Sequence, residues 1–178
     1  LDAEIMLNLD SEDDSEITIG CAGGIDVTVT GTFDSVPVEA GCKAYDIAVK
    51  GLTGGHSGMD IHLGRGNANK LLNRILLEAD NYCGIGIAAI HSGGLRNAIP
   101  REGFATVVVP ASRAAEFEAF VKDMEQVLKA EYATTDPNLV VLLDATDVPL
   151  QVIEPDYQAA LLRAVAVCPN GIHRMSPD

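Results

Sequence analysis

The sequence contains no tryptophan, and aromatic residues make up only 4% of its 178 residues. Basic residues are also scarce, because 12 Lys and Arg stand against 26 Asp and Glu and give a formal net charge of -14. Nucleic acids and anionic membranes are bound through basic patches, so this deficit argues against both as partners. No apolar run approaches the roughly 20 residues of a membrane-spanning helix. The composition therefore predicts a globular, water-soluble chain.

Cysteine is sparse as well, and Cys21, Cys42, Cys83 and Cys168 are far apart in the chain. No C-x-x-C pair and no Cys/His spacing of a zinc finger occurs, so a structural zinc site is not predicted. Scattered cysteines of this kind are typical of buried, reduced thiols, and we expect a cytoplasmic location. The even number leaves two disulfides as the alternative.

Several catalytic and binding motifs are incomplete. The stretch 55–59, "GHSGM", lacks the last glycine of a nucleophile elbow, and no H-E-x-x-H metalloprotease motif is present. The acidic run 10–15 lacks the glycine, and position 21 the glutamate, that an EF-hand loop requires. The stretch 64–70, "GRGNANK", lacks the glycine spacing of a Walker loop, so it supports phosphate binding only weakly. No single local motif therefore assigns an activity.

What is present is a regular alternation of strand-like and helix-like segments. Short runs of alternating or β-branched residues predict strands at residues 4–9, 25–30, 45–49, 84–90, 105–109 and 139–143. Apolar residues at helical spacing predict helices at residues 68–79, 117–128 and 156–167. The order β-α-β-β-α-β predicts an α+β fold, a ferredoxin-like antiparallel sheet with its helices on one face. The other face or an edge strand is then left for dimerisation.

The segment 50–58, "KGLTGGHSG", joins a predicted strand to a predicted helix and places His56 among glycines. Glycines allow sharp turns and a close approach of the backbone to a ligand, so this loop is a candidate site. The alternative is an ordinary glycine-rich connection whose histidine is a surface residue. A second polar loop, "HSGGLRNAIPRE", carries Arg96, Asn97 and Arg101 between two predicted strands.

Three segments together resemble one family. "LNLDSEDDSEITIGCAGG", "KGLTGGHSGMDIHLGRGNANKLL" and "GGLRNAIPRE" are similar, in this order and spacing, to the aminoacyl-histidine dipeptidases of the M20 metallopeptidases. The resemblance implies a parent enzyme with an α/β catalytic domain that holds two zinc ions, and an inserted lid domain that forms the homodimer. Residues 1–24 would be the end of a catalytic-domain segment and a hinge, and residues 25–178 a lid domain truncated at its C-terminal end.

The resemblance also implies roles for individual residues. Asp10 matches a zinc ligand at a strand end, and His56 matches a histidine that reaches the other subunit's active site and stabilises the oxyanion. Asn97 matches a substrate-binding residue, and Arg96 is a candidate for the substrate carboxylate, with a surface ion pair as its alternative. The family's other metal ligands have no counterparts, because the only histidines are His56, His62, His91 and His173. We therefore expect this chain alone to hold no zinc stably and to be inactive.

The implied parent is a cytosolic peptidase that hydrolyses Xaa-His dipeptides, with a small dipeptide as substrate and neither nucleic acid nor membrane as partner. A second interpretation is a non-catalytic ferredoxin-like domain for effector binding or oligomerisation, because a fold does not determine a function. A third is an enzyme that binds phosphate through "GRGNANK".

Overall fold

The computed structural model describes residues 4–5, 15 and 23–175, and the chain divides into two units, Leu1–Thr32 and Phe33–Asp178. In the first unit, residues 23–32 form neither helix nor strand. The prediction of a half-buried strand at 25–30 is therefore wrong. The alternation exists, but Ile25, Val27 and Val29 are 80–90% exposed. A strand forms only where its backbone groups join a hydrogen-bonded ladder with another strand, and within the described part of the chain residues 25–30 join no such ladder.

Some predictions fall on residues outside the described part of the chain. These are Asp10, Cys21 and all but the first two residues of the strand predicted at 4–9.

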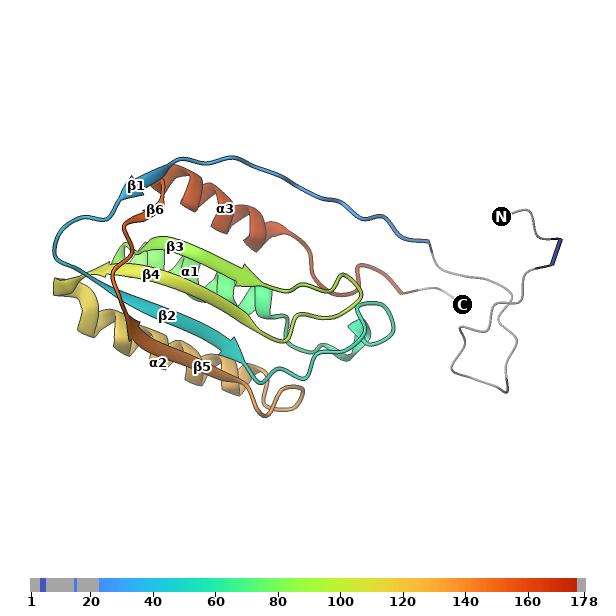
Figure 1. Ribbon diagram of the computed structural model, residues 1–178. Helices are drawn as coiled ribbons and strands as arrows, with labels where there is room; N and C mark the ends of the chain where they lie inside the picture. The colour runs from blue at the N-terminus through green and yellow to red at the C-terminus, as the bar shows by residue number, and fades with distance from the viewer. Residues whose placement is uncertain (1–3, 6–14, 16–22, 176–178) are drawn as a thin grey trace. The chain divides into compact units, whose positions relative to one another are not determined.

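The second unit is built on a four-stranded antiparallel sheet (Figure 1). Its strands, in the spatial order β3-β4-β2-β5, are β2 (Cys42–Lys50), β3 (Gly86–Ser92), β4 (Gly103–Pro110) and β5 (Val140–Thr146). Two helices, α1 (Ala68–Cys83) and α2 (Ala114–Glu131), cover one face of the sheet. This is the predicted β-α-β-β-α-β arrangement, so the α+β fold with helices on one face is confirmed.

Helix α1 begins and ends where its flanking residues satisfy the helix termini. Asn67 caps the start by accepting a hydrogen bond from Asn69 N at 3.0 Å, and Gly84 ends the helix with a left-handed φ of 67°. The apolar residues that predicted the helix form its buried face: Ala68, Leu71, Leu72, Ile75, Leu76 and Ala79. Each buried leucine or isoleucine contributes about 1.5–3 kcal/mol. The periodic pattern therefore positions α1 on the sheet.

Further elements extend this unit beyond the ferredoxin-like pattern. They are the antiparallel pair β1 (Ser35–Pro37) and β6 (Gln151–Ile153), the helix α3 (Pro155–Val167), and the short 3-10 turns η1 (Ile61–Leu63) and η2 (Ala111–Arg113). Helix α3, which the sequence predicts at 156–167, packs against α1.

The buried side chain of Gln158 joins α3 to the edge strand β3. Its Oε1 accepts a hydrogen bond from Ile87 N at 2.7 Å, and its Nε2 donates to Ile85 O at 2.9 Å and to Asp80 Oδ1 at 3.0 Å. A buried amide is stable only when its polar atoms are bonded in this way. Gln158 therefore fixes the position of α3 against the sheet.

The main core lies between the sheet and its helices. Phe117 of α2 is fully buried, and its ring centroid lies 5.4 Å from that of Tyr45 on β2. The Tyr45 hydroxyl donates to Glu118 Oε1 at 2.6 Å. Burial, together with this carboxylate, raises the pKa of Tyr45 to about 12, because both disfavour the phenolate.

Cys42, Cys83 and Cys168 are free thiols, so the disulfide alternative does not apply to these described cysteines. Cys83 is buried as predicted, and burial raises the pKa of its thiol. The prediction is wrong for Cys168, which is exposed where α3 ends. No helix within residues 23–175 is long and apolar enough to cross a membrane.

Candidate functional site

Asp136 fixes both ends of the glycine-rich loop between β2 and α1. It is 1% exposed, its Oδ1 accepts a hydrogen bond from Thr53 N at 2.8 Å, and its Oδ2 accepts one from Gly66 N at 2.8 Å. A buried carboxylate requires such partners, so the loop has a defined conformation. The sequence pattern gives no signal for Asp136, because its partners are main-chain atoms 70 and 83 residues away.

Positions 54 and 55 accept only glycine, because arginine side chains lie where any other side chain would begin. Their φ angles are +68° and +142°, in the region that favours glycine. A Cβ on Gly54 would lie 2.3 Å from Arg101 Cγ, and a Cβ on Gly55 would lie 2.4 Å from Arg65 Nη1. Arg65 Nη1 also donates to Gly54 O at 2.7 Å, and Arg101 Nε donates to Leu52 O at 3.2 Å. The two guanidinium groups thus hold the backbone of the loop.

His56 is exposed, but the loop binds one nitrogen of its imidazole. Nδ1 accepts hydrogen bonds from Gly58 N at 3.0 Å and from Met59 N at 3.1 Å. A ring nitrogen that accepts a hydrogen bond carries no proton, so the neutral imidazole carries its proton on Nε2. The ring therefore offers an N–H donor at Nε2.

Main-chain contacts join the histidine loop to the loop between β3 and β4. They are the bond from Ser57 N to Asn97 O at 2.9 Å, the bond from Ile99 N to Gly55 O at 2.8 Å, and an antiparallel bridge between His56 and Ala98. Both loops lie at the same end of the sheet (Figure 1). The structure therefore brings together His56, Asn97 and Arg96, which the sequence places in separate segments, and all three are exposed.

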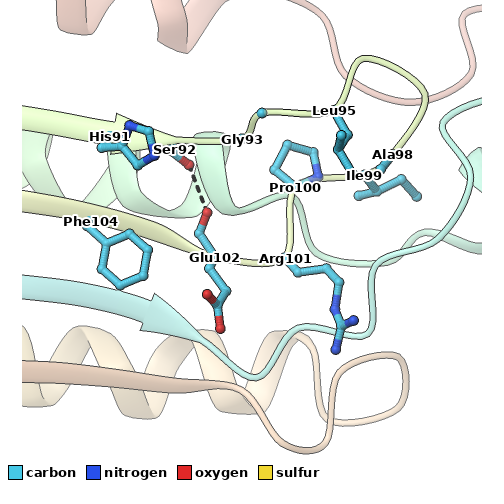
Figure 2. A pocket seen from close by; sticks show the side chains of 11 residues that line it. His91, Ser92, Gly93, Leu95, Ala98, Ile99, Pro100, Arg101, Glu102 and Phe104 are labelled. Atoms are coloured by element: carbon cyan, nitrogen blue, oxygen red, sulfur yellow. Dashed lines mark hydrogen bonds between the residues drawn. The ribbon is translucent and has the colours of Figure 1, made fainter.

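A groove of about 300 Å³ adjoins the paired loops (Figure 2). Its lining comes from the end of β3, the following loop and the start of β4, and includes Leu95 and Phe104. Ser92 Oγ lies 2.5 Å from Asn69 Oδ1 and 3.2 Å from Glu102 O, and so links the end of β3 to α1 and to the residue before β4 beside the groove. Ala98, the bridge partner of His56, belongs to the same lining. The groove is therefore continuous with the candidate site and is at the lower end of the size of small-molecule sites.

Lys70, the lysine of "GRGNANK", is bonded to helix α3. Its Nζ donates to Val165 O at 2.7 Å, to Ala166 O at 2.9 Å and to Cys168 O at 2.8 Å. An ammonium group has three donors, and these carbonyls at the end of α3 take them all. The lysine is therefore a helix-capping residue, which argues against the phosphate-binding interpretation.

No group of three or more His, Cys, Asp or Glu side chains within the described residues is placed to hold a metal ion. The described part of the chain therefore does not fit a zinc site by itself, and Asp10 lies outside it.

The sequence profile of the family described as the peptidase dimerisation domain matches residues 47–136, which include His56, Arg96, Asn97 and Asp136. The chain belongs to the M20 peptidase dimerisation-domain family. The Escherichia coli K12 cytosol non-specific dipeptidase is 40% identical over 176 residues, which are 99% of this chain and 36% of that protein. The structure of the aminoacylhistidine dipeptidase from Vibrio alginolyticus matches with a TM-score of 0.79 and 36% identity, over 82% of this chain and 30% of that one.

The chain thus spans about a third of the length of either relative. The resemblance to the M20 family is confirmed.

Proposed function

We propose that this chain is the lid and dimerisation part of a cytosolic dinuclear-zinc dipeptidase that hydrolyses Xaa-His dipeptides. Membership of the dimerisation-domain family supports it, as do two similar proteins whose names describe dipeptidases, one of them cytosolic and one of them an aminoacylhistidine dipeptidase. The same family membership favours a peptidase over the non-catalytic effector-binding interpretation.

The observation that carries the proposal is the pairing of the two loops with His56 as an N–H donor. When water adds to a peptide carbonyl group, the carbonyl oxygen becomes negatively charged. The Nε2–H of His56 donates a hydrogen bond to that oxygen. A preorganised donor of this kind is worth about 3–4 kcal/mol in the barrier. The amide of Asn97 both donates to and accepts from the dipeptide backbone, and the guanidinium of Arg96 binds its carboxylate.

The three side chains are exposed at one end of the domain, so another surface has to complete the site. In the proposal that surface is the catalytic cleft of the partner subunit in a homodimer formed through the lid. The zinc ligands belong to the rest of the parent polypeptide, with Asp10 as the ligand that this chain contributes. The chain alone then binds zinc weakly and hydrolyses no dipeptide.

Complementation between subunits tests the proposal in the complete enzyme. His56→Ala leaves the metal ligands intact, whereas Asp10→Ala leaves the histidine intact. In a mixed dimer, the histidine of the second variant meets the metal site of the first and gives one working site. Each heterodimer should therefore recover up to about half of the wild-type activity, if the two sites are independent.

A matched control replaces the second variant by the double variant Asp10→Ala/His56→Ala, which brings no intact histidine to the mixed dimer. Activity should then stay at the level of the separate variants. If the first mixture forms mixed dimers, as shown by two different tags, and recovers no activity, His56 does not act across the subunit interface.

A further inference from the structure

Asp60 closes the turn that carries the candidate catalytic histidine. Its Oδ2 accepts a hydrogen bond from His56 N at 2.8 Å, and its own N–H donates to His56 O at 3.0 Å. Inside this turn the N–H groups of Gly58 and Met59 point at Nδ1 of the imidazole, at 3.0 and 3.1 Å. The direction of the imidazole therefore depends on the turn that Asp60 closes.

Arg65 holds the Asp60 carboxylate against the loop. Its Nη1 lies 3.5 Å from Asp60 Oδ2 and donates to Gly54 O at 2.7 Å. Gly55 is in close contact with this pair, because a Cβ there would lie 2.4 Å from Arg65 Nη1 and 2.6 Å from Asp60 Oδ2. The backbone that leads into His56 thus rests on the ion pair.

Stability alone does not account for this arrangement. The side chains of Arg65 and Asp60 are 24% and 34% exposed, and partly exposed ion pairs contribute little to the free energy of unfolding. Each partner also bonds the main chain of the loop, at Gly54 O and at His56 N. The pair is therefore placed to fix a conformation.

We propose that Asp60, held by Arg65, is a positioning residue that fixes the His56 imidazole with Nδ1 bonded to the turn and Nε2–H directed outward. This inference rests on the proposed function, in which that N–H donates to the oxygen that develops charge. A donor aligned before the reaction needs no reorientation when the charge forms. Without Asp60 the ring rotates about its side-chain bonds, and the donor is aligned for only part of the time.

Nuclear magnetic resonance on this chain tests the positioning directly, at a pH where the imidazole is neutral. Asp60→Ala removes the acceptor for His56 N, whereas Asp60→Asn keeps a side-chain oxygen there. Glu131→Ala is the matched control, because it removes another partly exposed ion pair, with Arg74, that lies on the helices and not in the loop.

In the unaltered chain we expect Nδ1 of His56 to be unprotonated and the Gly58 and Met59 amides to exchange their hydrogens slowly. Asp60→Ala should lose the slow exchange at both amides, and Asp60→Asn and Glu131→Ala should keep it. Slow exchange that survives in Asp60→Ala, or a protonated Nδ1 in the unaltered chain, would falsify the proposal. If Asp60→Ala unfolds, Arg65→Gln gives the same test, because it removes both the group that holds Asp60 and the donor to Gly54 O, and both amides should again exchange faster.

A double-mutant cycle in the complete enzyme provides the kinetic test. We expect Asp60→Ala to lower kcat by about 10-fold with KM little changed, which is less than the about 10²–10³-fold loss expected for His56→Ala. Because Asp60 acts through His56, the double variant should be no slower than His56→Ala alone. Additive losses in the double variant would show that Asp60 acts independently, and would overturn the positioning role.

The two tests separate this inference from the proposed function. If His56→Ala leaves kcat unchanged, the catalytic role of the histidine fails, and the resonance experiment still decides whether Asp60 fixes the ring. If the resonance experiment fails and His56→Ala lowers kcat, the catalytic role stands and the positioning role of Asp60 is wrong.

Discussion

The segments 50–58 and 64–70 are both rich in glycine and polar residues, yet the structure uses them in opposite ways. In the second, Lys70 directs all three of its donors to carbonyl groups at the C-terminal end of α3, and Asn67 caps α1. In the first, the loop binds only Nδ1 of His56 and leaves the ring exposed. The comparison teaches that a polar motif is available for chemistry only where the fold does not already bond its donors.

The largest expected effect separates activity from stability at His56. In the complete enzyme, the proposed function predicts that His56→Ala lowers kcat by about 10²–10³-fold, because one preorganised donor to the oxyanion would be lost. The free energy of unfolding should change by about 1 kcal/mol or less, because the side chain is exposed and water can replace the two hydrogen bonds that its Nδ1 accepts. Steady-state kinetics and urea unfolding measure the two quantities, and His62→Ala, at another exposed histidine, is the control. If His56→Ala lowered the free energy of unfolding by as much as it raised the kinetic barrier, His56 would be a structural residue, as Lys70 is.

The next effect is on stability, at the residue that holds the histidine loop. Asp136→Asn places an NH₂ group against the backbone N–H of Thr53 or Gly66, which leaves a buried donor without an acceptor. We expect the free energy of unfolding to fall by about 2–3 kcal/mol in urea titrations. Asp123→Asn, on the exposed surface of α2, should change it by less than about 0.5 kcal/mol. Equal effects of the two substitutions would contradict the conclusion that Asp136 fixes both ends of the loop.

Tyr45, in the main core of the domain, should make the free energy of unfolding depend on pH. Because its pKa is about 12 in the folded chain and 10.0 for an ordinary tyrosine, folding favours the protonated hydroxyl. The associated stability is fully present below pH 10 and is lost as the pH rises through about 12, to a total of about 3 kcal/mol. The measurement is the difference in unfolding free energy between the wild type and Tyr45→Phe across this range. A difference that stays constant with pH would show that the hydroxyl is not bonded as described.

The smallest expected effect is at Lys70. Lys70→Met keeps the aliphatic part of the side chain but removes the donors to the end of α3, and we expect a loss of about 1–2 kcal/mol in unfolding free energy. The kcat of the complete enzyme should not change. Lys43→Met, at an exposed position of β2, is the control. A loss of activity without a loss of stability would mean that Lys70 has a functional role and not a structural one.

The topology of the domain is predictable from the sequence because periodic apolar positions mark the buried faces. Leu72 of α1 and Val107 of β4 are fully buried and lie in segments that the pattern assigns correctly. The same reasoning fails at 25–30, where the alternation is present but the described residues supply no neighbouring strand. A periodic pattern records which side chains are apolar, but it does not record whether a pairing partner exists.

The candidate site is predictable only in part. His56, Arg96 and Asn97 are found through resemblance, and the structure places their loops together. Asp60 and Asp136 are missed because their hydrogen-bond partners are main-chain N–H groups, which are the same at every position of a sequence. Arg101 is a similar case, because its Nε donates to the main-chain oxygen of Leu52, and no local sequence pattern marks that contact.

The contacts that pair the two loops have a consequence for how such a site can diverge. Ser57 N, Asn97 O, Ile99 N and Gly55 O are backbone atoms, so the pairing does not depend on which side chains stand at 96 and 97. Substitutions at these two positions can therefore alter what the loops recognise while the backbone stays in place. If the proposed function holds, the residues that build the fold are then separate from those that select the substrate, and directed evolution of substrate preference can start at positions 96 and 97.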